Sequence, residues 1–363
     1  MSGPSFGVEE EFLLVDPLTG RPVPCSREVV RRAAHRGLDL KLEFTASQVE
    51  AATGKSQSSS ALHEEITQLR AAAAESAREA GALLLAVGLP PRLGGCMPLT
   101  DTPRYRRMVE DLGMVTAERG HCGCHVHVEV PSREAAIAVS NWLRPWLPIM
   151  LALTANSAIY RDVDTRHASW RYMLWNRWPS AGPPPYFPSV ADYDRAVAML
   201  LDSGAIADDA MVYWYIRPSV RFPTVEVRIA DVPATATETV LHATLVRAAV
   251  LTALAADERG EQAPAVADHV VAAACWKAAH DGMAGQLIDV LGSGRAAPAA
   301  QVLKRWLVEL RPALLSLGDA DWVCTELPRL RRRGNGAVRQ RRAWNRRASA
   351  LEVVAAAAAD SLR

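Results

Sequence analysis

The chain has 363 residues, of which 49% are hydrophobic and 22% charged, a composition typical of a soluble globular enzyme. Its formal net charge of +1 gives no bulk electrostatic argument for binding to nucleic acid or to a membrane surface. The start lacks the basic and apolar regions of a signal peptide, and the longest apolar stretches, Ala82–Pro91 and Trp146–Leu153, are too short to span a bilayer. Six scattered cysteines fit reduced thiols better than a disulfide framework, so we expect a cytoplasmic protein.

Three consecutive glutamates, Glu9, Glu10 and Glu11, begin a predicted strand that continues through Val15. Because strand side chains alternate between faces, Glu9 and Glu11 share one face and Glu10 lies on the other. Two carboxylates on one face of a strand that enters the core repel each other and lose hydration. We therefore expect a cation or arginines beside Glu9 and Glu11.

The next segments are predicted from helix caps, breakers and apolar periodicity. In chain order they are a helix at 27–36, an extended stretch at 40–49 that continues into a loop, a long helix at 59–80, a buried strand at 83–87 and a helix at 102–118.

Two further predicted strands, at 124–130 and 224–231, place ionisable residues on one face and mainly valine on the other. Their polar faces carry His125, His127 and Glu129 in the first strand and Thr224, Glu226 and Arg228 in the second. The segment at 161–188 is rich in Arg, Trp and Pro and is predicted to be an ordered functional loop. Further helices are predicted from 131 onward with breaks at Pro145 and Pro148, and at 191–204, 238–259, 265–291, 298–317 and 340–362.

Strands that are apolar on one face and ionisable on the other indicate an antiparallel sheet with helices on one side and a polar cleft on the other. We therefore predict an α+β fold. If the polar-faced strands converge on one site, residues 7–231 must belong to one domain, with the C-terminal helices packed on its back. We predict a single domain over 1–363, with a sheet-forming part at about 5–235 and a mostly helical part at about 236–363.

The polar faces and the segment around residue 45 supply one set of candidate site residues. They are Glu9, Glu11, Glu43, Glu50, His125, His127, Glu226 and Arg228. An oxygen-rich set with imidazole suits Mg²⁺ or Mn²⁺, and several carboxylates suggest two ions about 3.5–4 Å apart. An arginine on the same strand face as a ligand carboxylate suits a transferring phosphoryl group. Each part alone also has an ordinary interpretation as surface glutamates, half-buried histidines or a cross-strand ion pair.

The stretch from His121 to His127 offers another metal interpretation, because it packs three histidines and two cysteines into seven residues. Structural zinc sites usually combine a Cys-x₂₋₄-Cys pair with a second pair further along. Here Cys122 and Cys124 are separated by one residue and no second cluster follows. We therefore expect both cysteines to be small apolar residues of the core.

A strongly basic region lies between 329 and 347. Its arginines are Arg329, Arg331, Arg332, Arg333, Arg339, Arg341, Arg342, Arg346 and Arg347. They form a solvated helix face, a nucleic-acid surface or a set of phosphate contacts. The near-neutral total charge counts against nucleic acid, and the other two interpretations remain open.

In combination, several stretches resemble the type 2 glutamate–cysteine ligases, bacterial carboxylate–amine ligases, over nearly the whole chain. They are GVEEEF at 7–12, SQVEAATG at 47–54, GCHVHV at 123–128, RYMLW at 171–175, RWP at 177–179, GPP at 182–184, RP at 217–218 and PTVEVR at 223–228. The resemblance implies the glutamine synthetase/guanidino kinase catalytic fold, an antiparallel sheet curved into a funnel with helices on its outer face. It also implies ATP, Mg²⁺ or Mn²⁺ and glutamate.

The same resemblance implies roles for individual residues. One metal ion would be held by Glu11, His125 and Glu226, and the second by Glu9, Glu43 and Glu50. Catalytic roles would belong to Arg228, as a contact to the transferring phosphate, together with Glu226 and Glu11. Substrate or ATP contacts would come from Arg171, Arg177, Arg217, His127 and Thr224. Glu129 departs from the family, which commonly has glycine there, so it either affects the choice of amine or lies at the rim of the funnel.

The implied reaction activates the side-chain carboxylate of L-glutamate as an acyl phosphate and joins it to an amine, L-cysteine by resemblance. The segment at 161–188 is a candidate lid. The alternatives are ligation to a non-cysteine amine and a non-catalytic paralogue that binds nucleotide or metal. The expected partners are these small molecules, without nucleic acid or membrane, and a homo-oligomer is compatible with the sequence.

Overall fold

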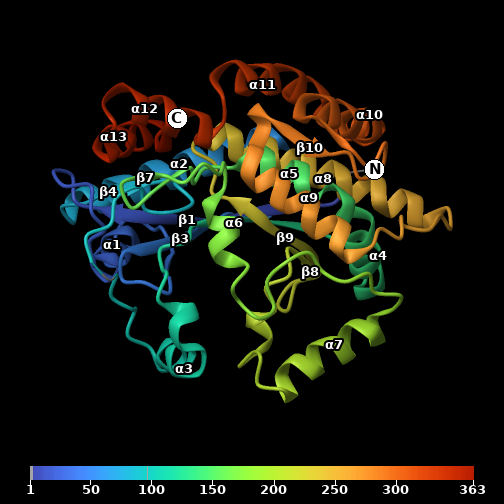
Figure 1. The fold of residues 1–363 in the computed structure, drawn as a ribbon, viewed down its shortest axis with the longest axis horizontal. Coiled ribbons are helices and arrows are strands. Elements are labelled where there is room, and N and C mark those ends of the chain that lie inside the picture. Colours follow the sequence, from blue (N-terminus) through green and yellow to red (C-terminus); the bar gives the residue numbers. More distant parts are fainter. Residues whose placement is uncertain (1–2, 96) are drawn as a thin grey trace.

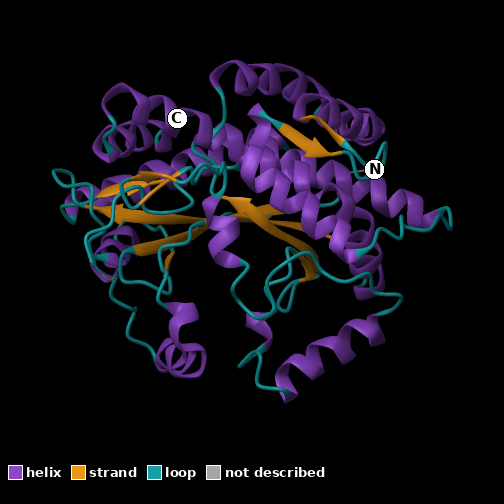
Figure 2. Ribbon diagram, viewed as in Figure 1, coloured by secondary structure: helices purple, strands orange, loops and turns teal. Residues whose placement is uncertain are grey.

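The computed structural model describes residues 3–95 and 97–363, and within them a seven-stranded antiparallel sheet forms the centre of the molecule (Figures 1 and 2). The strands are β1 (Phe6–Val15), β2 (Leu40–Leu42), β3 (Gln48–Ala52), β4 (Leu83–Leu85), β5 (Gly123–Glu129), β8 (Ile216–Pro218) and β9 (Thr224–Asp231). Their order is β2-β3-β1-β5-β9-β8, and β4 pairs with the end of β1. Strand β1 is therefore central, with partners on both sides.

Helices make up most of the remaining described structure. They are α1 (Ser26–Ala34), α2 (Ser59–Glu79), α3 (Pro103–Leu112), α4 (Arg133–Leu143), α5 (Leu147–Thr154), α6 (Trp170–Trp175), α7 (Val190–Asp202), α8 (Ala236–Glu258), α9 (Asp268–Asp281), α10 (Ala299–Leu317), α11 (Ala320–Arg333), α12 (Gly336–Arg347) and α13 (Ala350–Ser361). Short strands β6 (Ile159–Tyr160) and β7 (Val163–Asp164) form one small sheet, and β10 (Gln286–Ile288) and β11 (Ala296–Pro298) form another. Every strand of the large sheet ends by Asp231, whereas the C-terminal part is mostly helical.

The two faces of the sheet have different neighbours. Helices α5, α8 and α9 cover one face, α10 and α11 lie beyond them, and α3 and α7 lie on the opposite side (Figure 1). On the helix-covered face, Val8, Val126, Val128, Val225 and Val227 are buried in one hydrophobic cluster with apolar residues of these helices. The predicted combination of helices with a half-buried antiparallel sheet is confirmed, because the valines that alternate with ionisable residues all point into this core.

Several predicted elements differ in detail. The predicted extended stretch at 40–49 is instead the hairpin of β2 and β3, which turns at 43–47. The predicted helix at 340–362 breaks at Ala348, which has a left-handed φ of 48°, and Ser349 then caps α13. The predicted helix at 265–291 ends at Asp281. Helix α11 was not predicted, and the predicted loop at 161–188 contains β7 and α6. Local signals of turns and caps decided these boundaries more than the apolar pattern did.

Two helical stretches, Arg133–Thr154 and Ala236–Glu258, are long and apolar enough to cross a membrane by length and composition. In the structure 89% and 78% of their most apolar windows are buried inside the protein, as expected of core helices. The described cysteines are free thiols, and Cys96 lies outside the described residues.

Glu10, the middle glutamate of β1, lies on the helix-covered face as predicted and is buried. Arg70 of α2 donates two hydrogen bonds to its carboxylate, of 2.6 and 3.0 Å, and Thr239 of α8 donates a third of 2.6 Å. The Arg70 guanidinium also donates to the carbonyl oxygens of Pro233 and Ala234. This buried ion pair therefore joins β1 to α2 and to the beginning of α8.

We predict that Arg70→Ala lowers the free energy of unfolding by about 3–5 kcal/mol, because it leaves the Glu10 carboxylate buried without its partner. Denaturant unfolding measures the change. The matched control is Arg78→Ala in the same helix, whose ion pair with Glu75 is exposed to solvent and contributes little to stability. Equal effects of the two substitutions would contradict the assigned role of Arg70.

Candidate active site

Direct cross-strand pairing places ionisable residues side by side on the open face of the sheet. The opposed pairs are Glu11 with Glu50, Glu9 with His125, and His127 with Glu226. Directly opposed side chains in antiparallel strands are close enough to interact. The pairing of β5 with β9 shifts register between Cys124 and Val126, where the single residue His125 of β5 opposes two residues of β9, Arg228 and Ile229.

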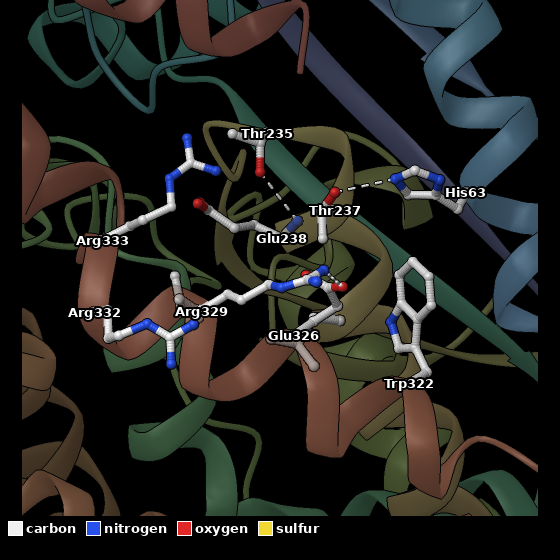
Figure 3. Close-up of a pocket in the computed structure, with 11 residues that line it drawn as sticks. His63, Thr235, Thr237, Glu238, Trp322, Glu326, Arg329, Arg332 and Arg333 are labelled. Carbon is white, nitrogen blue, oxygen red and sulfur yellow. Dashed lines mark hydrogen bonds and ion pairs between the residues drawn. The ribbon is translucent and has the colours of Figure 1, made fainter.

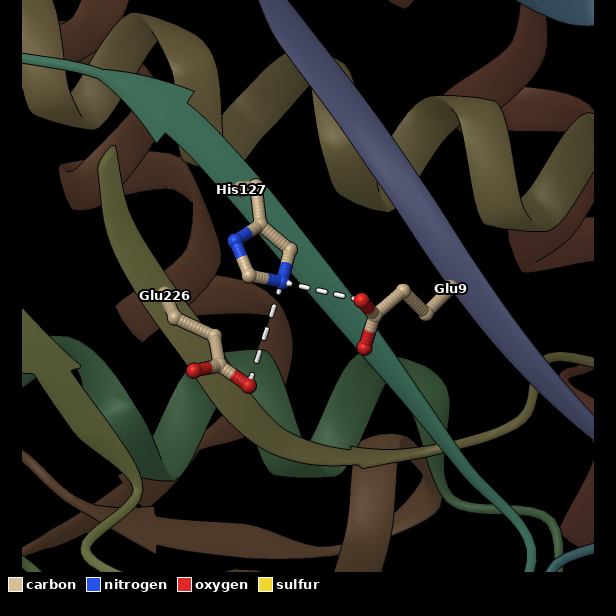
Figure 4. Close-up of side chains that lie close together, drawn as sticks. All are labelled: Glu9, His127 and Glu226. Carbon is tan, nitrogen blue, oxygen red and sulfur yellow. Dashed lines mark ion pairs between the residues drawn. The ribbon is translucent and has the colours of Figure 1, made fainter. Parts of the chain in front are cut away.

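Glu9, His127 and Glu226 form one group whose ligand atoms all lie within 4.8 Å of one another (Figure 4). The Nε2 atom of His127 lies 3.5 Å from Glu9 and 3.9 Å from Glu226. Its Nδ1 atom lies 3.0 Å from the hydroxyl of Thr224, which orients the ring. Nε2 is buried and makes no hydrogen bond to the described residues, so it is available to a ligand.

His125 lies between this group and the other carboxylates. Its Nδ1 atom is 3.2 Å from Glu9 and 3.9 Å from Glu226, and its Nε2 atom is 3.9 Å from Glu11. Burial of Glu9 opposes its ionisation, but the hydrogen bond with His125 and the charges of His125 and His127 outweigh burial and hold the pKa of this carboxyl well below its usual range.

Glu11, Glu43 and Glu50 form a second group with ligand atoms within 4.8 Å of one another. The backbone N–H of Gly123 donates a 2.6 Å hydrogen bond to Glu11, and Lys41 lies 3.3 Å from Glu50. Burial and the charges of Glu11 and Glu50 raise the pKa of Glu43 well above its usual range, and burial with the charges of Glu9 and Glu11 raises the pKa of Glu50. This end of the site therefore carries negative charge that the protein does not fully offset.

Glu226 is offset by arginines. Arg217 of β8 donates from Nε to Glu226 at 2.9 Å, and Arg228, two residues along β9, forms an ion pair with its other oxygen. Burial opposes ionisation of Glu226, but the charges of Arg228 and Arg217 outweigh it and hold the pKa of the carboxyl well below its usual range. A buried carboxylate stays ionised here because two guanidinium groups surround it.

Both groups have a donor set suited to a divalent cation, because carboxylate oxygens and imidazole are the ligands that Mg²⁺ and Mn²⁺ accept. The Nε2 atom of His127 makes no hydrogen bond to the described residues and lies between two carboxylates, a position in which it can bind a cation together with them. The raised pKa values of Glu43 and Glu50 agree with a second place for a positive charge. The residues present therefore fit two cations.

The grouping differs from the arrangement that the resemblance implied. Glu11 lies with Glu43 and Glu50, whereas Glu9 lies with His127 and Glu226. The reason is the register of the sheet, since Glu11 directly faces Glu50 across β1 and β3. His125 contacts members of both groups, which keeps it in the site that the sequence predicted.

Two cavities meet along this row of side chains, and both include Glu9 in their walls. The first, of about 210 Å³, is aromatic and is lined by Phe44, Tyr105, Trp175, Trp178 and Tyr213 together with the second carboxylate group, Arg104 and Arg228. The second, of about 290 Å³, is lined by Lys41, Lys55, His127, Phe222, Thr224 and backbone of β1 and of the segment 52–54. The site can therefore hold two substrates on either side of Glu9.

The other predicted arginines lie away from these walls. Arg171 is buried, donates to the carbonyl oxygen of Ala230 and lies over the ring of Trp175. Arg177 is exposed and bonds to the carbonyl oxygen of Leu174. Arg217 uses its remaining donors on backbone carbonyls, including Val212 at 2.6 Å. None of the three is among the residues lining either cavity, so their predicted substrate contacts remain predictions.

Glu129 lies at the outer end of β5, on the same face as His127. It is exposed, and Ser5 donates a 2.6 Å hydrogen bond to its carboxylate. These bonds from Ser5 lower the pKa of Glu129. Of the two predicted alternatives, this position agrees with the rim rather than the interior of the site.

Cys122 and Cys124 are fully buried in hydrophobic clusters, which confirms their expected role as apolar core residues. Burial raises the pKa of both thiols well above its usual range. Among the described residues, neither group of possible metal ligands contains a cysteine.

Several residues of the cavity walls were not predicted. Tyr105 and Arg104 come from α3, Tyr213 precedes β8, Lys41 lies in β2, and Lys55 follows β3. The density of Trp and Pro in the segment 161–188 was the usable signal, since Trp175 and Trp178 do line the aromatic cavity. Nothing local in sequence marked the residues of α3 or the two lysines.

Two solved structures share this fold. A bifunctional glutathione synthetase from Pasteurella multocida has a TM-score of 0.72 and 14% identity, with 99% of this chain and 52% of that chain covered. A glutamate–cysteine ligase from Francisella tularensis, solved in complex with AMP, has a TM-score of 0.70 and 12% identity, with 99% and 89% covered. At these identities the likeness concerns the fold alone.

Sequence relatives are much closer. A protein of Mycolicibacterium smegmatis named "Putative glutamate–cysteine ligase 2-3" is 55% identical over 97% of both chains, and a relative from Mycobacterium sp. strain KMS is 52% identical over 99% of both. The family model described as glutamate–cysteine ligase family 2 matches residues 5–356. These matches define an enzyme of the ATP-dependent, carbon–nitrogen bond-forming ligase class. The chain belongs to glutamate–cysteine ligase family 2.

Gly123 leads to a prediction, because a Cβ atom there would lie 2.4 Å from Nη2 of the buried Arg171. We expect Gly123→Ala to lower the free energy of unfolding by about 1–3 kcal/mol, because the added methyl group overlaps Arg171. We also expect it to lower activity, because it would displace the Gly123 N–H that donates a hydrogen bond to Glu11. In an Arg171→Met background the penalty should shrink by about 1 kcal/mol or more. If Gly123→Ala lowers the free energy of unfolding equally with and without Arg171→Met, the strain does not arise from contact with Arg171.

Proposed function

We propose that this enzyme activates the side-chain carboxylate of L-glutamate with ATP as an acyl phosphate and joins it to the amine of L-cysteine, forming γ-glutamylcysteine. The observation that carries the proposal is the row of carboxylates and histidines on the open face of the sheet, where two cavities meet beside Arg228. Membership of glutamate–cysteine ligase family 2 supports the choice of substrates. The proposed catalytic sheet is curved into a funnel within a single cytoplasmic domain.

Two divalent cations, Mg²⁺ or Mn²⁺, would be held by Glu9, His127 and Glu226 and by Glu11, Glu43 and Glu50, with His125 between them. Such cations would supply positive charge that offsets the negative charge developing on the transferring phosphoryl group. The Nε2 atom of His127, which makes no hydrogen bond to the described residues, and the repulsion among the three glutamates of the second group support this assignment.

Arg228 is the proposed contact to the transferring phosphoryl group. It lines the aromatic cavity, and its guanidinium is held in place by Glu226. A preorganised donor at the place where charge develops stabilises the transition state more than a mobile one. Arg217 serves as a positioning residue, because it fixes the other oxygen of Glu226 and is itself tied to the backbone carbonyl of Val212.

The aromatic cavity would protect the acyl phosphate from hydrolysis until the amine attacks. Trp175 and Trp178 come from the segment 161–188, and Tyr105 and Tyr213 complete the wall. Aromatic walls exclude water, which would otherwise compete with the amine. This placement supports the segment 161–188 as part of the closure over the site.

Substitution of single carboxylates tests the assignment. We expect Glu11→Gln and Glu226→Gln each to lower ATP turnover, measured as ADP release with glutamate and cysteine, by at least about 100-fold while circular dichroism shows an intact fold. The matched control is Glu129→Gln at the rim, for which we expect turnover near that of the unsubstituted enzyme. Near-normal turnover in both Glu11→Gln and Glu226→Gln would contradict the proposed site.

The acceptor amine is tested by product mass. With ATP, Mg²⁺ and glutamate, a panel of amines should yield γ-glutamylcysteine as the main product. The alternative of a non-cysteine acceptor rests on Glu129, an unusual carboxylate beside the cavity that holds His127. If a different amine gives the main product, the proposed ligase reaction is supported, but L-cysteine is not the acceptor. ATP binding with no ADP release for any amine would instead indicate a non-catalytic paralogue.

A further inference from the structure

The basic region of the sequence forms a concave surface on the helical side of the molecule, away from the site on the open face of the sheet. A cavity of about 400 Å³ lies between the beginning of α8, His63 of α2, and α11 (Figure 3). A second cavity of about 370 Å³ lies between α12 and α13. Both cavities include Arg333, so we treat them together as the basic cleft.

The basic cleft has a large local excess of positive charge. Seven arginines line it, against three carboxylates, which leaves a surplus of four positive charges in a chain whose total is only +1. The arginines are Arg329, Arg332, Arg333, Arg339, Arg342, Arg346 and Arg363, and the carboxylates are Glu238, Glu326 and Asp360. Like charges gathered in a concavity raise the local potential and favour an anion.

The three carboxylates are already engaged. Arg339 lies 2.7 Å from Glu238 and 2.8 Å from Asp360, and Arg329 lies 2.6 Å from Glu326. Within residues 3–95 and 97–363, no carboxylate lies within ion-pair distance of Arg332 or Arg346. The protein therefore leaves guanidinium groups in the basic cleft that an external anion can bind.

The other groups around the larger cavity are hydrogen-bond donors of the kinds that bind phosphate. Thr235, the N-cap residue of α8, and Thr237 in its first turn line the cavity, and a helix of this length presents partial positive charge at its N-terminus. Trp322 lines the same space, and its indole Nε1 makes no hydrogen bond to the described residues (Figure 3). Arginine forks match phosphate oxygens in geometry as well as in charge.

Size and shape favour a small ligand. A cavity of about 400 Å³ falls within the range of small-molecule sites. At one side of it the rings of Trp322 and His63 lie 5.2 Å apart and offer an aromatic surface beside the arginines. A nucleic-acid strand requires an extended basic track, and the near-neutral charge of the whole chain provides none.

We propose that the basic cleft binds a small phosphate-bearing anion, either pyrophosphate or a nucleoside phosphate, at a place distinct from the ligase site. The phosphate would contact the arginines at the end of α11 and the first turn of α8. A nucleoside base, where present, would lie against Trp322 and His63.

Isothermal titration in the presence of EDTA tests the proposal with pyrophosphate and with AMP as the probes. Arg332→Ala/Arg333→Ala should weaken pyrophosphate binding at least tenfold. The control Arg31→Ala/Arg78→Ala removes the same charge from exposed arginines outside the basic cleft and should leave binding unchanged. Trp322→Phe, which keeps a ring but loses the N–H donor, should also weaken binding, and thermal unfolding verifies that each variant is folded.

The two probes separate the sources of the phosphate. Tighter binding of AMP than of pyrophosphate, with photo-crosslinking of an azido-AMP to His63 or Trp322, identifies a nucleotide site. Equal binding without such crosslinks identifies a site for the phosphate group alone. Binding that both double variants reduce equally, or that neither reduces, overturns the proposal. So does tighter binding of a 20-mer oligonucleotide than of either probe.

Discussion

The structure depends on keeping five carboxylates close together on one face of a sheet whose other face is the hydrophobic core. Burial removes hydration from these groups, and their mutual repulsion raises the cost of ionising all of them. The protein offsets this charge unevenly. Arg217 and Arg228 surround Glu226, whereas Lys41 and the imidazole of His125 are the groups within ion-pair distance of Glu11, Glu43 and Glu50 in the described chain. Negative charge therefore remains at one end of the site, where the proposed cation would stabilise it.

The same strand that carries Glu9 and Glu11 also carries Glu10, and the three glutamates have separate environments. Glu10 is buried among helices, where Arg70 and Thr239 satisfy it. Since Arg70 also holds the carbonyl oxygens that lead into α8, the ion pair positions the helix layer against the strand. The site on one face and the helix packing on the other thus share one strand, and changes in its register would disturb both.

Alternation along three strands predicted the polar face, the apolar face and the separation of Glu10 from its neighbours, and the structure agrees. The spacing of Cys122 and Cys124, which does not fit a structural zinc site, predicted that both are core residues, and the structure agrees. The sequence alone did not predict which site residues lie next to one another. Glu11 joined Glu43 and Glu50 because β3 faces β1 in a register that no single strand encodes. The contact of Arg217 with Glu226 was also not predicted, since only the β8–β9 pairing places the two side chains opposite each other.

The amino-acid sequence by itself determined which residues face which side of each strand, because a period of two follows from backbone geometry. With the family resemblance it also determined the class of enzyme. Only the tertiary structure decided which carboxylates meet, which aromatic residues of α3 and of the segment before β8 wall the cavity, and which arginines remain without a carboxylate in the basic cleft. These properties depend on contacts between segments far apart in the chain, and local periodicity contains no information about such contacts.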